Sequence, residues 1–107
     1  MTAHHDGCFG CGQTNLFGLQ LELEEADGVV RGRFFVKQDH QGSPGVAHPG
    51  ILAAALVEAL SRFGDVGEAG VEFRAPAPVG TFVEIEASPG GAVARSGESV
   101  LARLAAA

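Results

Sequence analysis

The stretch Gly42–Phe63, GSPGVAHPGILAAALVEALSRF, decides the fold of this 107-residue chain. It is a glycine- and proline-rich loop that runs directly into an apolar segment carrying one acid, Glu58. Pro49 suits the first position of a helix, because its ring fixes φ and a first-turn N–H has no partner within the helix. The apolar residues that follow recur at i, i+3 and i+4, which predicts a helix that ends at Gly64. Because nearly its whole circumference is apolar, we expect a sheet to wrap around it.

The remainder of the chain has the periodicity of strands. Leucines alternate with polar residues over 19–24, which is typical of a strand with one buried face. Asp27-Gly28 indicates a hairpin turn into a second strand over 30–37, and alternation returns after the helix at 71–74, 83–86, 92–95 and 99–104. This layout predicts a single α+β domain over 1–107, in which a curved antiparallel β-sheet surrounds one long central α-helix. Residues 1–15 are expected to form an irregular lead-in.

Charge and composition narrow the classes of partner. The net charge of −6 argues against a nucleic-acid backbone and against an anionic membrane surface. No run approaches the ~18 consecutive apolar residues of a membrane helix. The start of the sequence has neither the basic nor the apolar region of a secretory signal. We therefore expect a cytoplasmic protein with no nucleic-acid partner and no membrane partner.

The lead-in contains HHDGCFGCG, with His4, His5, Cys8 and Cys11. A C-x-x-C pair with a histidine supplies ligands that suit zinc. A structural zinc site needs four ligands, however, and the sequence has no second C-x-x-C. The sequence favours a tight glycine turn with small, reduced thiols packed beneath it over a zinc knuckle or a redox pair. We therefore expect no metal and no cofactor.

Three segments resemble the hotdog-fold acyl-CoA thioesterase superfamily, and in particular its branch with an opening CFxCG signature. They are CFGCGQTNLFGLQLEL, DHQGSPGVAHPGILAAALVEAL and VEFRAPAPVGTFVEIEA, which follow one another over about Cys8 to Ala87. The resemblance implies a hotdog fold and a homodimer or homotetramer whose sheets join edge to edge. It also implies an active site between protomers at the amino end of the helix. The implied substrate is an acyl-CoA or another pantetheine thioester.

The catalytic loop of that family reads HGG, and a carboxylate follows nine residues after the histidine. There the first glycine N–H binds the thioester carbonyl, and the carboxylate acts as nucleophile or general base. In this sequence His48 and Gly50 match, but Pro49, which has no N–H, stands at the first glycine. The carboxylate position is Val57, and the acid follows one residue later as Glu58.

The resemblance therefore gives Glu58, His48 and Gly50 as candidate catalytic residues. The N–H groups of Gly50 and Ile51 are expected to be free at the helix start, where they could hold an oxyanion. Each candidate also has a structural interpretation. Glu58 would form a surface ion pair with Arg62 at i+4, and His48 would shape the loop.

The candidate substrate contacts lie near the helix start and on the strand after it. Arg74 is placed to meet a CoA phosphate, or else is an exposed strand arginine beside Glu72. His40 is expected to be solvated. The candidate substrate-binding residues are Gln41, Pro49, Ile51, Phe73 and Arg74.

Two functions follow. The first is hydrolysis of an acyl-CoA or other pantetheine thioester, with Glu58 as a displaced carboxylate. The second is a catalytically silent hotdog protein that binds acyl-CoA or fatty-acyl ligands or serves as an assembly partner. A zinc-bound structural module is a third interpretation.

Overall fold

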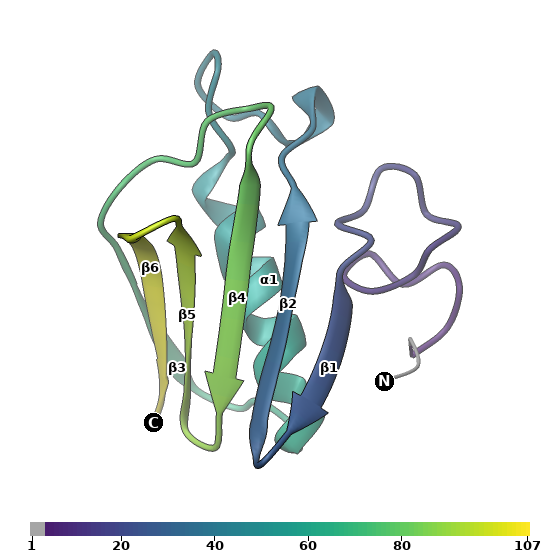
Figure 1. Ribbon diagram of the computed structural model, residues 1–107, viewed down its shortest axis with the longest axis vertical. Helices are drawn as coiled ribbons and strands as arrows, with labels where there is room; N and C mark the ends of the chain where they lie inside the picture. Colours follow the sequence, from purple (N-terminus) through teal and green to yellow (C-terminus); the bar gives the residue numbers. More distant parts are fainter. Residues whose placement is uncertain (1–3) are drawn as a thin grey trace.

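The structure, a computed structural model, describes residues 4–107 as a curved antiparallel sheet around one long helix (Figure 1). The helix α1 (Pro49–Leu60) is preceded by a short 3-10 helix, η1 (Gln38–His40), and followed by another, η2 (Ser61–Phe63). The strands are β1 (Glu22–Ala26), β2 (Val29–Phe35), β3 (Ala69–Phe73), β4 (Phe82–Ser88), β5 (Gly91–Ser96) and β6 (Ser99–Ala106).

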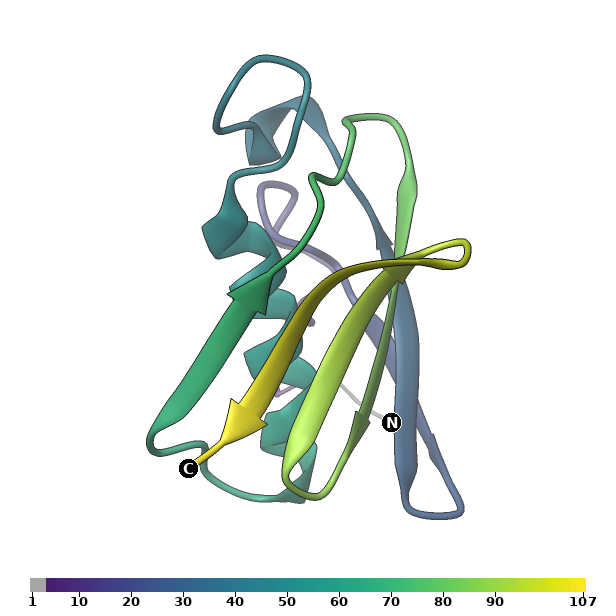
Figure 2. The same ribbon diagram turned by 90° about the vertical axis from the view of Figure 1, so that its left-hand side faces the viewer.

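The six strands form one sheet in the order β1-β2-β4-β5-β6-β3. In this order β1 and β3 form the two edges of the sheet. All neighbouring strands are antiparallel. The sheet curves around α1, which lies against its concave face (Figure 2). The α+β architecture predicted from the periodicity of the sequence is therefore confirmed.

Most of the circumference of α1 is covered, as the sequence predicts. Leu52, Leu56 and Leu60 are buried in the core with the inward-facing residues of the sheet. One stripe remains open toward solvent, where Val57 is 40% exposed. Gly64 follows η2 with φ 135°, a backbone conformation that glycine adopts without strain. The helical segment therefore ends where the sequence places its end.

The first strand begins later than the leucine alternation predicts. β1 starts at Glu22, because Gln20 has a positive φ of 51° that interrupts the extended backbone. Leu19, Leu21 and Leu23 are nevertheless all buried in the core. The alternation thus identified the buried face correctly although it did not mark the strand boundary.

His40 is 1% exposed, so the expectation that it is solvated is wrong. Its Nδ1 accepts the Lys37 N–H at 3.1 Å, which leaves Nε2–H to donate to the Gly18 carbonyl at 3.2 Å. Burial lowers the pKa of His40, and the charge of Lys37 acts in the same direction. Asp39 and the carbonyls of Gly18 and Phe17 oppose this shift. A neutral His40 therefore connects the segment just before β1 to η1.

Within residues 4–107, no helix is long and apolar enough to cross a membrane.

Candidate functional site

The amino end of α1 is capped by a histidine. His48 has an extended backbone, and its Nδ1 accepts the Gly50 N–H at 2.8 Å. The Ile51 N–H donates to the His48 carbonyl at 2.8 Å. The expectation that the N–H groups of Gly50 and Ile51 are free is therefore wrong. His48 satisfies two of the donors that a helix start leaves without an intrahelical partner.

The loop before α1 is held in place by the segment that follows β3. The Ala47 N–H donates to the Ala77 carbonyl at 2.8 Å, and the Val79 N–H donates to the Gly45 carbonyl at 2.9 Å. Within the loop, Oε1 of Gln41 accepts the Gly45 N–H at 2.7 Å. These bonds fix the loop beside the helix start, so Gln41 acts on loop shape.

A cleft of about 330 Å³ opens beside the amino end of α1. Three of the five candidate substrate contacts line it, namely Pro49, Phe73 and Arg74, whereas Gln41 and Ile51 do not. The Arg74 guanidinium lies at this cleft and donates to the carboxylate of Glu72. The full lining is Ser43, Val46, Ala47, Pro49, Leu52, Phe73, Arg74, Ala75, Pro76 and Ala77.

Glu58 does not line this cleft. Its side chain is 9% exposed, and its Oε2 lies 3.5 Å from Nη2 of Arg62. The i+4 ion pair expected from the sequence is thus present, but it is buried and not at the surface. Glu58 lies eight helical steps after Gly50, which is about 12 Å along the axis at 1.5 Å per residue. The structure therefore separates Glu58 from the other two candidate catalytic residues.

The Glu58 carboxylate instead meets the lead-in. Oε2 lies 3.0 Å from Nδ1 of His4, and Oε1 lies 3.4 Å from Sγ of Cys8. Cys8 and Cys11 are free thiols, and burial raises the pKa of Cys11. The sequence suggested that His4 and the two cysteines lie close together, but it did not indicate that Glu58, 50 residues from Cys8, would join them. The one sequence feature that marks Glu58 is its position as the single acid in an otherwise apolar segment.

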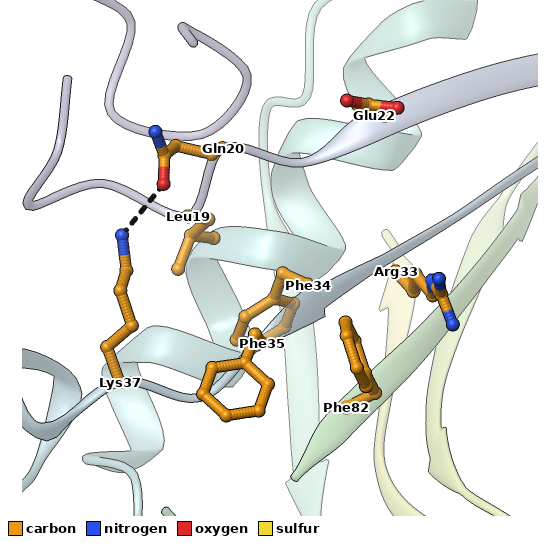
Figure 3. Close-up of a pocket in the computed structure, with 8 residues that line it drawn as sticks. All are labelled: Leu19, Gln20, Glu22, Arg33, Phe34, Phe35, Lys37 and Phe82. Carbon is orange, nitrogen blue, oxygen red and sulfur yellow. Dashed lines mark hydrogen bonds between the residues drawn. The ribbon is translucent and has the colours of Figure 1, made fainter. Parts of the chain in front are cut away.

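A second cleft, of about 280 Å³, lies near the end of β2 (Figure 3). Phe35 and Phe82 pack edge to face there, with ring centroids 5.2 Å apart, and the Arg33 guanidinium lies 4.3 Å from the Phe82 centroid. Because side chains alternate along a strand, Phe35 and Arg33 face away from the core that contains Phe34. None of the candidate site residues lines this cleft.

The sequence matches no family model and no curated protein. Solved structures with the same architecture include a thioesterase superfamily protein with a TM-score of 0.70 and 21% identity, over 80% of this chain and 51% of that one. The chain therefore spans about half the length of that protein. It has the hotdog fold. Thioesterase superfamily member 2 of Mus musculus aligns with a TM-score of 0.65 and 17% identity, over 78% of this chain and 77% of that one.

A third hotdog structure is the PaaI protein of the phenylacetic acid degradation operon of E. coli. Its TM-score is 0.68 and its identity 11%, over 82% of this chain and 77% of that one. The fold that the three sequence segments imply is thus confirmed. In this chain the hotdog helix carries the cleft at its amino end and the contacts of Glu58 with His4 and Cys8 near its carboxyl end.

Proposed function

We propose that this hotdog protein binds an acyl-CoA, or another pantetheine thioester, at the amino end of α1. The observation that carries the proposal is the cleft of about 330 Å³ at this position, with a largely apolar lining and one guanidinium. Such a cleft suits a ligand with an apolar chain and a phosphorylated carrier. Small-molecule sites of a few hundred Å³ are typically apolar with a few placed polar groups.

Each candidate substrate contact has a part in this proposal. Phe73 and Pro49 supply apolar wall for the acyl or pantetheine chain. Arg74 exchanges its contact with Glu72 for a phosphate of the carrier, since guanidinium groups bind phosphate oxygens in paired hydrogen bonds. Gln41 and Ile51 act indirectly, through the shape of the loop and the start of the helix.

A second copy of the chain completes the site in this proposal. Among the described strands β3 pairs only with β6, so its other side offers unpaired backbone groups of the kind that join sheets. Phe73, at the end of β3, is half exposed, as is Val57 on α1. Edge-to-edge pairing of β3 with a second β3 gives a homodimer, and the outer face with Phe35 and Phe82 offers a contact for a homotetramer.

The groups near the expected thioester position favour binding over rapid hydrolysis. Pro49 has no N–H to donate, the Gly50 N–H is bonded to His48, and Val57 supplies no carboxylate. Removal of one oxyanion donor typically costs about 10²–10³ in rate. We therefore expect the chain to be catalytically silent or very slow.

Hydrolysis is the second candidate function, and His48 is the observation that favours it. The exposed His48 ring accepts the Gly50 N–H, so rotation of this one side chain frees a donor for a thioester carbonyl. Glu58 would then be the carboxylate that activates water, which requires it to leave its contacts with His4 and Cys8.

Calorimetric titration with acyl-CoAs of increasing chain length tests binding, and chromatographic detection of released CoA tests turnover. Chromatography avoids thiol reagents, which would also modify Cys8 and Cys11. We expect saturable binding that Arg74→Gln weakens by about tenfold, the effect of one lost charge-assisted hydrogen bond. Failure of every acyl-CoA to bind would refute the proposal.

Restoration of the two altered positions gives a sharper test of the chemistry. Pro49→Gly returns an N–H, and Val57→Asp places a carboxylate on the open stripe of α1, from which in the proposed dimer it would face the cleft of the second copy. We expect the double variant to release CoA about 10²-fold faster than the original chain, whereas the matched control Pro49→Gly with Val57→Asn does not. Turnover by the original chain that Glu58→Gln abolishes would instead establish hydrolysis as its function.

A further inference from the structure

Four side chains of metal-ligating types converge between the lead-in and α1. They are His4, Cys8, Cys11 and Glu58, whose donor atoms all lie within 4.8 Å of one another. Nδ1 of His4 is 3.0 Å from Oε2 of Glu58, 3.4 Å from Sγ of Cys11 and 3.8 Å from Sγ of Cys8. A single ring nitrogen thus lies beside one carboxylate oxygen and two sulfur atoms. The donor atoms of the four side chains therefore converge on one region.

Four of the separations are close to those of donor atoms around a tetrahedral zinc ion. Zinc lies about 2.3 Å from a thiolate sulfur and about 2.0–2.1 Å from an imidazole nitrogen or a carboxylate oxygen. At tetrahedral angles, two neighbouring donors are then about 3.3–3.8 Å apart. The three His4 distances and the 3.4 Å between Sγ of Cys8 and Oε1 of Glu58 span 3.0–3.8 Å. An ion at the centre therefore requires the four donor atoms, which lie within 4.8 Å of one another, to draw together around it.

The lead-in is folded so that its donors face α1. The Gly12 N–H donates to the Cys8 carbonyl at 2.9 Å and closes the turn between the two cysteines. Gly10 lies inside this turn, where a Cβ would fall 2.2 Å from Oε1 of Glu58. The absence of a side chain at Gly10 therefore lets the carboxylate approach the thiols.

The charge and burial of the cluster favour a bound cation. As metal ligands the two cysteines are thiolates, and together with the carboxylate and a neutral imidazole they carry three negative charges, which only a bound cation makes tolerable in a largely buried site. Oε2 of Glu58 is buried and accepts no hydrogen bond within residues 4–107. A divalent ion reduces the charge to −1, and the Arg62 guanidinium, 3.5 Å from that oxygen, offsets the remainder. A contact of this kind also orients a ligating carboxylate.

We propose that His4, Cys8, Cys11 and Glu58 bind one zinc ion through Nδ1, the two Sγ atoms and a carboxylate oxygen. Thiolate ligands select zinc over magnesium and calcium, which prefer oxygen. Four protein ligands leave no open position, so the site is structural. Because Glu58 is 50 residues from Cys8 in the sequence, the ion fastens the lead-in to the hotdog helix.

The zinc site goes beyond the proposed thioester binding and does not depend on it. Glu58 is about 12 Å along the helix axis from Gly50, so the ion lies away from the cleft. A zinc-bound Glu58 is not available to activate water. The site therefore favours the catalytically silent protein over the hydrolase.

Elemental analysis of the full chain, purified without an affinity tag and in the presence of a reductant, tests the proposal directly. We expect about one zinc per chain. We also expect the cobalt-substituted protein to have the absorption bands of a tetrahedral site with thiolate-to-cobalt charge transfer. Removal of zinc with a chelator should lower the melting temperature, and added zinc should restore it, because the ion binds the folded chain.

Variants assign the ligands. Cys8→Ser and Glu58→Gln should each lose most of the bound zinc, whereas His5→Ala and Glu68→Gln, exposed residues outside the cluster, should retain it. Analysis of the unaltered chain keeps the test decisive if a ligand variant fails to fold. A zinc-free protein that gives no tetrahedral cobalt spectrum after reduction and reconstitution would overturn the proposal, as would a Cys8–Cys11 disulfide in that protein. Equal zinc content in the ligand variants and the controls would also overturn it.

Discussion

Leu56 and Val57 are neighbours on α1 with opposite environments. Leu56 is fully buried in the core, whereas Val57 is 40% exposed. Because α1 has this orientation, the side chain of Glu58 contacts the lead-in cysteines and does not line the cleft. The proposed thioester site and the proposed zinc site therefore both depend on the orientation of α1. Truncation of each residue to alanine tests it directly.

We expect Leu56→Ala to lower the free energy of unfolding by about 2–5 kcal/mol. This cost combines the lost burial of the side chain with the cavity left in a core that relaxes only in part. At about 4 °C per kcal/mol for a domain of this size, the melting temperature should fall by about 8–20 °C. Val57→Ala should change stability by about 0.5 kcal/mol or less, because the better helix propensity of alanine offsets the modest loss of burial.

Urea titration followed by far-ultraviolet circular dichroism measures both effects, since the chain has no Trp or Tyr to report by fluorescence. All variants should be compared at one protein concentration, because the unfolding of an oligomer depends on it. A cost below about 1 kcal/mol for Leu56→Ala would contradict the orientation of α1 described above. Equal costs at the two positions would contradict it as well.

Two further predictions concern the lead-in and the loop before α1. Gly10→Ala should destabilise the fold by about 1–3 kcal/mol in urea titrations, because the new Cβ forces the Glu58 carboxylate away from Cys8. Gly7→Ala is the matched control, since its Cβ makes only ordinary contacts with the His5 ring; equal stability of the two variants would refute the close approach at Gly10. Burial holds the pKa of His40 below its ordinary value of 6.5. As the pH first falls below 6.5, the imidazole is therefore protonated in the unfolded chain but not in the folded chain. The free energy of unfolding then decreases by up to about 1.4 kcal/mol per pH unit. His40→Gln should therefore lose stability less steeply as the pH falls below about 6.5, and parallel slopes for the two proteins would contradict the buried neutral state.

The elements of the fold could be predicted from the sequence because their signals are local. Alternation of apolar residues identified the buried faces of the strands, and i, i+3, i+4 spacing identified α1 and its end near Gly64. The resemblance to the hotdog superfamily also predicted that Pro49, Phe73 and Arg74 contact one substrate, and these residues do line a common cleft. This prediction was possible because the three sequence segments follow the order of the elements that form the cleft.

The sequence did not predict the contacts of two histidines. His48 caps α1 and occupies the Gly50 N–H, although histidine is not among the usual capping residues. His40 is buried, and its Nε2 meets the carbonyl of Gly18, which is 22 residues away in the sequence. The cap is a local contact that residue preferences do not reveal, whereas the contact of His40 forms between segments that only the folded chain brings together.

The sequence by itself determined the helix, the strands and the apolar faces on which the hotdog fold rests, because burial of a periodic face is encoded within each segment. Only the tertiary structure decided the environment of Glu58. The side chain of Glu58 points about 100° around the helix axis from that of Val57. The packing of α1 against the sheet directs it toward His4 and the cysteines. The direction of a single side chain on a largely apolar helix is set by what packs around the helix, and that information is distributed over the whole chain.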